Sequence, residues 1–400
     1  MSNDGATEIA VHGDVRSDFA AVRSAFADVL QADRAGGALC VVHRGETVVD
    51  LWGGVDPLSG TAWERDSTTL AFSAAKGIVA MLVAQQIQRG TIDPLAPVAA
   101  YWPEFAVAGK ASITVADVLT HTAGMPTLPL DDARDLLDPV RLAARAAQRS
   151  PDYPPGSARV YHVLSYGLLA GEILRRVTGL DAGALLQREI AAPLGADLWL
   201  GTPPEADGRF RPVLMDPIVP PPEPGGTDSA SGAACRSAYT STLQIVPLFE
   251  REDGVQGTEL VNGSDFRRAL VPGGGLVATA RGIARAYGAC VAPVNGVRLL
   301  DDDTVAKVSA DWLDGVAEPA CNPAAALTTR WGLGFEIAHE LCPMLGPGSF
   351  GHAGMGGRLA FAHPGSRTGF AFIGQRMLFP EPGRDPRWRR LLDALAPALG

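Results

Sequence analysis

Ser73-Ala74-Ala75-Lys76 begins a stretch of this 400-residue chain in which apolar side chains recur every three or four residues up to Gly90. That period predicts a helix, and the two small alanines suit a closely packed first turn. Residues three apart on a helix share a face, with Cβ atoms about 5–6 Å apart. We therefore expect a buried helix whose first turn presents a hydroxyl and an amine side by side. Its apolar residues are Ile78, Val79, Leu82, Val83 and Ile87.

This tetrapeptide fits S-x-x-K, a serine acylation motif. Serine is a poor nucleophile unless a base lies beside it. A lysine desolvated at a helix N-terminus, near the positive end of the helix dipole, can lose its proton near neutral pH. The helix start also aims the backbone N–H of Ser73 at a developing oxyanion. The sequence predicts Ser73 as nucleophile and Lys76 as its activating partner, with an ordinary polar helix start as the alternative.

Lysine is rare in this chain, which holds 34 basic residues but only the lysines Lys76, Lys110 and Lys307. Arginine stays protonated in proteins and does not serve as a general base. The residues three before the other two lysines are Val107 and Thr304, so S-x-x-K occurs once. That single occurrence favours the catalytic interpretation.

Tyr161 is the predicted second catalytic group among six tyrosines. It follows the turn Pro154-Pro155-Gly156 and a short β-like run, and it precedes a helix expected from Ser165. A residue on a turn before a helix can point into a cleft. The alternative is a packing residue whose hydroxyl is satisfied locally.

The run Gly351-His-Ala-Gly-Met-Gly-Gly357 leads into a strand. Glycines let a substrate acyl group lie close against a strand edge. An edge N–H there, which we assign to Met355, can be the second oxyanion donor beside that of Ser73. A glycine-rich turn between strands is the alternative.

The remaining elements follow from hydrophobic period and turn residues. Helices are expected at 17–31, after the capping box Thr114–Asp117, at 139–149, 165–178 and 182–192, after Thr279 and from Pro386; strands at 38–42, 47–52, 331–338, 351–363 and 368–377. Strands near both termini with helices between them predict one sheet and a helical insertion. We expect a sheet domain from 10–66 and 271–400. We expect a mainly helical domain at 67–270, which contains the S-x-x-K helix, the Tyr161 loop and the Pro-rich segment 203–226. This Pro-rich segment is either a lid over a pocket or a plain connection.

Composition indicates a globular protein with a large core, since 46% of residues are hydrophobic and 20% charged. A net charge of -10 gives no basic footprint for nucleic acid or an anionic membrane. No run of 18 uncharged apolar residues predicts a membrane span. Residues 1–12 lack the basic and apolar regions of a secretory signal, so we expect a cytoplasmic protein.

Other kinds of site find little support in the sequence. Five cysteines without a C-x-x-C pair predict neither a disulfide framework nor a zinc knuckle. Seven histidines without H-E-x-x-H spacing predict no metal site, and no cofactor motif is present. Pro347-Gly-Ser-Phe-Gly351 only approaches G-x-S-x-G. The sequence therefore lacks the nucleophile elbow that an α/β-hydrolase needs. We expect His121, in a turn, to be a structural donor.

The order of S-x-x-K, a loop tyrosine and a glycine-containing strand resembles class C β-lactamases and D-alanyl-D-alanine carboxypeptidases. The resemblance runs from Val41 to the final helix. It implies an α+β fold of the β-lactamase/transpeptidase type, with an antiparallel sheet, flanking terminal helices and an all-helical insertion. Further supporting motifs are Asp93-Pro-Leu-Ala-Pro97, Leu119-Thr-His-Thr-Ala-Gly124, Trp331-Gly-Leu-Gly334 and Gly351-His-Ala-Gly354.

Two departures from that pattern favour the esterase branch, the family VIII-type carboxylesterases that act on small, short-chain esters. Where β-lactamases carry Y-x-N this chain has Tyr161-His162-Val163, and where they carry K-T-G it has His352-Ala353-Gly354. The resemblance implies that His162, His352, Ala353 and Gly354 bind substrate.

Several functional alternatives stay open. An alcohol or amine could replace water as the acyl acceptor, which would make the enzyme an acyltransferase. A β-lactamase, D-aminopeptidase or amidase is a further alternative, and a non-catalytic scaffold ranks below these. We also expect an activity change as the imidazole of His352 titrates between about pH 5 and 8. The sequence does not determine the oligomeric state.

Overall fold

The computed structural model describes residues 9–215, 258–313, 316, 329–379 and 385–400. Its main sheet has eight strands in the order β1-β3-β2-β12-β11-β10-β9-β8, and every neighbouring pair is antiparallel. The bounds are β1 Val11–Val15, β2 Gly37–His43, β3 Glu46–Gly53, β8 Arg330–Trp331, β9 Glu336–Ile337, β10 Phe350–Gly354, β11 Arg358–His363 and β12 Thr368–Gly374.

The two ends of the chain meet in the middle of this sheet. Strand β12 pairs with β2 along its whole length, from Thr368 opposite His43 to Gly374 opposite Gly37. A sheet assembled from both termini is what the strand pattern predicted, and this architecture confirms the expected α+β fold. The division into domains at residues 66 and 271 stays a prediction.

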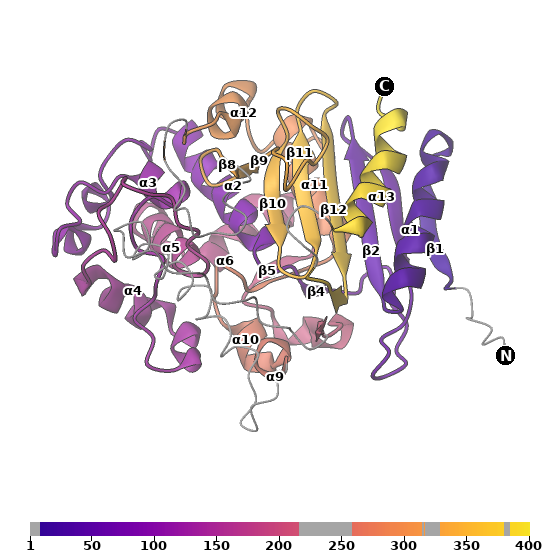
Figure 1. Ribbon diagram of the computed structural model, residues 1–400, viewed down its shortest axis with the longest axis horizontal. Helices are drawn as coiled ribbons and strands as arrows, with labels where there is room; N and C mark the ends of the chain where they lie inside the picture. The colour runs from indigo at the N-terminus through magenta and orange to yellow at the C-terminus, as the bar shows by residue number, and fades with distance from the viewer. Residues whose placement is uncertain (1–8, 216–257, 314–315, 317–328, 380–384) are drawn as a thin grey trace, which may run out of the picture.

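Each face of the sheet has its own hydrophobic core. Alternate side chains of a strand point to opposite faces, and along β2 Leu39 and Val41 join one core while Cys40 and Val42 join the other. The first core lies under α1 (Ala20–Asp33) and α13 (Pro386–Leu395), which lie side by side in Figure 1. The second lies under α11 and the helical part of the molecule.

Helix α11 (Ala280–Val291) packs unusually close to the sheet. A Cβ atom added to Gly369 of β12 would lie only 2.3 Å from the backbone nitrogen of Gly288 in α11. Glycine at this crossing is therefore a packing requirement. As predicted, the side chain of Thr279 caps the start of this helix by accepting the N–H of Gly282.

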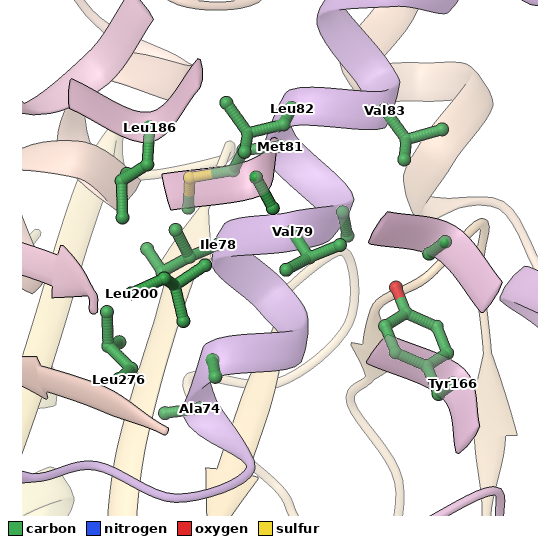
Figure 2. Packing of buried hydrophobic residues seen from close by; sticks show 14 of the residues in the cluster. Ala74, Ile78, Val79, Met81, Leu82, Val83, Tyr166, Leu186, Leu200 and Leu276 are labelled. Atoms are coloured by element: carbon green, nitrogen blue, oxygen red, sulfur yellow. The ribbon is translucent and has the colours of Figure 1, made fainter. Parts of the chain in front are cut away.

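Helix α2 (Ala74–Gln88) lies between the sheet and the other helices (Figure 1), and all its residues from Ala74 to Ile87 are buried. Figure 2 shows its side chains packing on more than one side, with Ile78 towards Leu200 and Val79 on the side of Tyr166. A helix buried all round fixes the position of its first turn rigidly. This confirms the helix predicted from Ser73.

The bounds of the other helices are α3 Val115–Leu119, α4 Pro139–Gln148, α5 Ser165–Thr178, α6 Ala182–Leu186, α7 Ala192–Leu194, α9 Glu259–Asn262, α10 Ser264–Arg268 and α12 Asp302–Ser309. Among these helices, α5, α6 and α12 pack against α2. A small sheet has the order β4-β7-β5, formed by Thr69–Leu70, Leu276–Ala278 and Leu198–Leu200, and β13 (Arg376–Met377) pairs with β6 (Leu214–Met215). The capping box before α3 is confirmed, because Thr114 and Asp117 cap each other's backbone N–H.

Three predicted elements are interrupted in the structure. The strand expected at 351–363 is a hairpin of β10 and β11, because Gly356 and Gly357 have φ of +77° and +93° and turn the chain. The strand expected at 331–338 is the pair β8 and β9, and the helix expected at 182–192 contains a π-helical turn at Gln187–Ala191. A period of hydrophobic residues does not register such local reversals.

Some predictions fall partly outside the described residues. In the Pro-rich segment, Pro204–Arg209 forms a 3-10 helix, while residues 216–226 lie outside the described part. Cys40, Cys290 and Cys342 are buried free thiols, and Cys235 and Cys321 lie outside the described part. Among the described helices, none combines the length and apolar character needed to cross a membrane.

Candidate active site

The start of α2 is held in a strained backbone conformation. Phe72, the residue before Ser73, has a φ of +47°, which is rare for a side chain of its size. Ser73 occupies the N-cap position, yet its side chain makes no capping hydrogen bond. Its hydroxyl is thereby left for another partner. Backbone strain of this kind is often concentrated at functional sites.

That partner is Lys76, one turn along the helix. The Nζ atom of Lys76 lies 3.1 Å from Oγ of Ser73 and 2.7 Å from the carbonyl oxygen of Gly273. The side chain is fully buried, and burial lowers the pKa of Lys76 to about 7. A buried amine with that pKa is substantially neutral at physiological pH, so it can accept a proton from the serine hydroxyl.

Tyr161 lies over this pair. Its ring is 4.9 Å from the Nζ atom of Lys76, measured to the ring centroid. Burial raises the pKa of Tyr161 above its ordinary value, although a hydrogen bond with the side chain of Ser73 acts in the opposite direction. The phenol is therefore a proton donor at neutral pH. The structure thus brings together the three side chains that the sequence singled out as catalytic.

His352 on β10 lies next to Tyr161, with its Nε2 atom 3.5 Å from the tyrosine hydroxyl. Its other ring nitrogen, Nδ1, lies 2.6 Å from the carbonyl oxygen of Ala353 and must donate to it. Nε2 is then an acceptor that faces the phenol. Burial lowers the pKa of His352 to about 4, so the imidazole is neutral across the pH range from 5 to 8. The expected titration of His352 in that range is therefore corrected.

The side chain of His162 is fixed within the protein by backbone groups. It is fully buried, its Nε2 atom accepts the N–H of Met125, and its Nδ1 atom lies 2.6 Å from the carbonyl oxygen of Val160. Both ring nitrogens are thus occupied by backbone groups. The geometry gives His162 a role in shaping the Tyr161 loop, and no ring nitrogen remains for the substrate contact expected from the sequence.

Strand β10 leaves part of its edge open beside Ser73. Strand β9 pairs only with Phe350 and Gly351 of β10, which leaves Ala353 and Gly354 without a neighbouring strand on that side. The N–H of Ala353 points to this side, where the carboxylate of Glu336 accepts it at 3.2 Å. Alternate residues direct their N–H groups the same way. We therefore expect the N–H of Met355 to point to the same open edge, as the oxyanion assignment requires.

Glu336 and His339 form a buried pair behind this edge. The Nε2 atom of His339 lies 2.8 Å from Oε1 of Glu336. Burial alone would raise the pKa of Glu336, but the hydrogen bond from His339 holds it below its ordinary value. A carboxylate with a lowered pKa keeps Ala353 in place without taking a proton itself.

Two arginines hold the turn that contains Met355. Arg358 donates to the carbonyl oxygens of Met355 and Gly356 at 3.2 and 3.3 Å, and Arg387 donates to Gly356 at 2.7 Å. Arg387 is itself held by buried ion pairs with Asp33 and Asp385, at 3.2 and 2.6 Å. These contacts fix the backbone of the turn that carries Met355.

The chain is similar to known proteins over nearly its whole length. A family model described as Beta-lactamase matches residues 21–395. The chain is 34% identical to Esterase/beta-lactamase LipL of Mycobacterium tuberculosis over 378 residues, covering 92% of this chain and 84% of that protein.

The chain belongs to the Beta-lactamase family.

Two solved structures show the same architecture within this family. A family VIII carboxylesterase superimposes with a TM-score of 0.81 at 30% identity, covering 97% of this chain and 100% of the other. A novel penicillin-binding protein homolog from Caulobacter crescentus gives a TM-score of 0.81 at 32% identity, with the same coverage. These similarities confirm the fold class and the family that the sequence motifs indicated.

Some residues around the site were not found from the sequence. The carbonyl group of Gly273, which accepts from Lys76, is a backbone group in a run of glycines and carries no side-chain signal. Glu336 follows Trp331-Gly-Leu-Gly334 and Arg358 follows the glycine run, but neither residue belongs to a motif that indicates its role. Across the described residues, no three His, Cys, Asp or Glu side chains gather as a metal site needs.

Proposed function

We propose that this member of the Beta-lactamase family is a serine carboxylesterase that cleaves small or short-chain esters through an acyl-enzyme on Ser73. One observation carries the proposal: Ser73 Oγ lies 3.1 Å from a fully buried lysine whose pKa burial lowers to about 7. Ester hydrolysis is also supported by the relative named as an esterase and by the family VIII carboxylesterase neighbour.

In the first step the neutral amine of Lys76 accepts the proton of the Ser73 hydroxyl while Oγ attacks the ester carbonyl carbon. A C–O bond forms, and the carbonyl electron pair moves onto oxygen. The backbone N–H groups of Ser73 and Met355 donate to this oxyanion. Removing one such donor typically slows catalysis by about 10²–10³-fold, so the turn containing Met355 must be held firmly.

In the second step the tetrahedral intermediate collapses and the C–O bond to the alcohol breaks. The leaving alkoxide takes a proton from Tyr161, which remains protonated because burial raises its pKa, and Lys76 then returns a proton to the phenolate. Because the two groups interact, they titrate as a pair. The lowered pKa of Lys76 and the raised pKa of Tyr161 favour Lys76 as base and Tyr161 as acid.

Water completes the cycle by attacking the acyl-enzyme. The same groups act in reverse order, so the proton of the water passes to the Tyr161–Lys76 pair and Ser73 recovers its own proton. An alcohol or amine that enters in place of water would make the chain an acyltransferase. That alternative uses the same acyl-enzyme and differs only in the acceptor.

Esters are favoured as substrates over β-lactams and peptides because of the residue at position 352, directly before Ala353. A neutral imidazole stands there, since burial lowers the pKa of His352 to about 4, and it offers no positive charge to a substrate carboxylate. Val163 stands where an amide-binding Asn would be expected. A β-lactamase, D-aminopeptidase or amidase therefore ranks below the esterase.

The test compares hydrolysis of p-nitrophenyl acetate, butyrate and octanoate with opening of a chromogenic cephalosporin, for the wild type and Ser73→Ala. Fast turnover of the short-chain esters, lost in the variant, with little cephalosporin opening is the expected result. A burst of one product per enzyme without turnover would favour the acyltransferase. Equal ester turnover by Ser73→Ala would exclude the mechanism.

A further inference from the structure

His121 lies in an unusual conformation beside the proposed proton donor. It follows the short helix α3, is fully buried, and has a φ of +65°. A left-handed backbone is uncommon for histidine and marks a residue whose surroundings hold it under constraint.

The backbone and the ring of His121 hold the chain on both sides of Tyr161. The N–H of Val160 donates to the carbonyl oxygen of His121 at 3.2 Å, and the N–H of His162 donates to its Nδ1 atom at 3.0 Å. These two amides belong to the residues immediately before and after Tyr161. One residue therefore fixes the backbone that carries the phenol.

The ring of His121 also touches the aromatic groups around the phenol. Its centroid lies 4.8 Å from that of Tyr161 and 4.4 Å from that of Trp331, the latter nearly perpendicular. Packing against the rings of His121 and Trp331 thus limits the rotation of the Tyr161 side chain. His121 therefore restricts both the backbone of Tyr161 and the direction of its side chain.

The hydrogen bond from His162 also determines the tautomer of His121. Because Nδ1 accepts an N–H, the proton of the neutral ring must be on Nε2. In the described part of the chain that Nε2 atom is buried and has no hydrogen-bond partner. A buried unpaired donor is unfavourable for stability, so an apolar ring would be better for packing alone. An apolar ring, however, has no acceptor for the N–H of His162, and this acceptor explains the histidine.

We propose that His121 is a positioning residue for Tyr161, which it holds against Ser73 and Lys76 by accepting the N–H of His162 and packing on the phenol. This role rests on the proposed esterase function. Burial keeps the pKa of His121 well below its ordinary value, and the titratable groups that face the ring, which are His162, Lys76, His352 and Arg159, act in the same direction. The ring therefore remains a neutral acceptor. This replaces the expectation that His121 is a structural donor.

The test compares two substitutions that both tolerate a left-handed backbone. In His121→Asn the amide oxygen stands near the position of Nδ1 and can accept the N–H of His162, whereas His121→Gly removes the acceptor. Both variants lose the imidazole ring, so their difference reports the hydrogen bond. Val22→Ala, in the core under α1, is the control for loss of stability alone.

Positioned acid–base groups contribute about 10²–10⁴-fold, so we expect His121→Gly to lower kcat on p-nitrophenyl butyrate by roughly 100-fold. KM should change by no more than about threefold, and His121→Asn should recover on the order of tenfold in kcat. Labelling of Ser73 by a fluorophosphonate should slow in parallel. Val22→Ala should lower the melting temperature without changing kcat at 20 °C.

Equal losses in His121→Asn and His121→Gly, in proportion to their melting temperatures, would overturn the positioning role. Unchanged kcat and labelling in His121→Gly would overturn it as well. A wild type that neither labels at Ser73 nor turns over any ester would instead contradict the proposed function. Because labelling needs no natural substrate, the two failures are distinguishable.

Discussion

The Nζ atom of Lys76 lies 3.1 Å from Oγ of Ser73, and this contact is made inside a helix that is buried on every side. Burial is what gives the contact its chemical value. In water the amine would stay protonated up to about pH 10 and would only donate to the serine. Inside the protein, burial lowers the pKa of Lys76 to about 7 and turns a donor into an acceptor.

The first prediction concerns the pH dependence of kcat/KM. The active form has a neutral Lys76, which predominates above its pKa of about 7. Activity is therefore present above pH 7 and falls about tenfold per unit as the pH drops below it. The measurement is kcat/KM for p-nitrophenyl butyrate from pH 5 to 8.5, corrected for spontaneous hydrolysis. A flat profile down to pH 5 would assign the base to another group.

The second prediction is that His352 does not cause the fall in kcat/KM below pH 7. Since burial lowers the pKa of His352 to about 4, its imidazole does not change charge between pH 5 and 8. His352→Ala should lower kcat/KM at all pH values, because Tyr161 loses its neighbour, and leave the midpoint near pH 7 in place. A midpoint that moves by a full unit would show that the imidazole titrates with the lysine.

A third prediction tests the phenol of Tyr161. Tyr161→Phe keeps the ring over Lys76 and removes only the hydroxyl, so kcat should fall by about 10²–10⁴-fold with little change in melting temperature. The matched control is Tyr287→Phe, because the hydroxyl of Tyr287 is buried and has no hydrogen-bond partner among the described residues. Similar kcat values for the two variants would remove Tyr161 from proton transfer.

Much of the fold could be predicted because its signals are local. The apolar period after Ser73, the capping box at Thr114 and the strands at both termini each depend on a few adjacent residues, and the structure contains all of them. Reversals at Gly356-Gly357 were missed, because alternation continues across a tight hairpin as if it were one strand. Sequence period reports which side of an element is buried, but not where it folds back.

The site was predictable only for groups whose residue type carries the chemistry. Ser73, Lys76 and Tyr161 fit a motif, and the structure places them together. The hydrogen bond from Lys76 to the carbonyl of Gly273, and that from the N–H of His162 to His121, depend on contacts between distant segments. The same holds for His162, whose ring is occupied by backbone groups that only the folded loop brings near. Long-range contacts of this kind have no local sequence signal.

The fourth prediction concerns Arg387, which holds the turn containing Met355 through Gly356. Arg387→Met leaves the carboxylates of Asp33 and Asp385 buried without their partner, and breaking such a pair costs about 3–5 kcal/mol of unfolding free energy. Arg390→Met on the same helix is the control, since its ion pair with Asp28 is exposed and worth at most about 1 kcal/mol. Denaturant unfolding measures both, and equal losses would contradict the buried network.

The last prediction follows from the stability cost of burying a lysine. Between its folded pKa of about 7 and its ordinary value of 10.5, Lys76 binds fewer protons in the folded chain than in the unfolded chain. Wild-type stability must therefore rise with pH in this window by about 1.4 kcal/mol per unit. Lys76→Met removes that dependence and, in the same step, abolishes ester hydrolysis.

The measured quantity is the difference in unfolding free energy between Lys76→Met and wild type from pH 7 to 9, since other titrating groups cancel. The variant should have its greatest advantage at pH 7 and lose roughly 2–3 kcal/mol of it by pH 9. The carbonyl of Gly273 loses its donor in the variant, which costs about 1–3 kcal/mol at every pH and leaves the slope intact. A constant difference across this range would mean that Lys76 keeps its ordinary pKa in the fold, and it would then be too basic to activate Ser73.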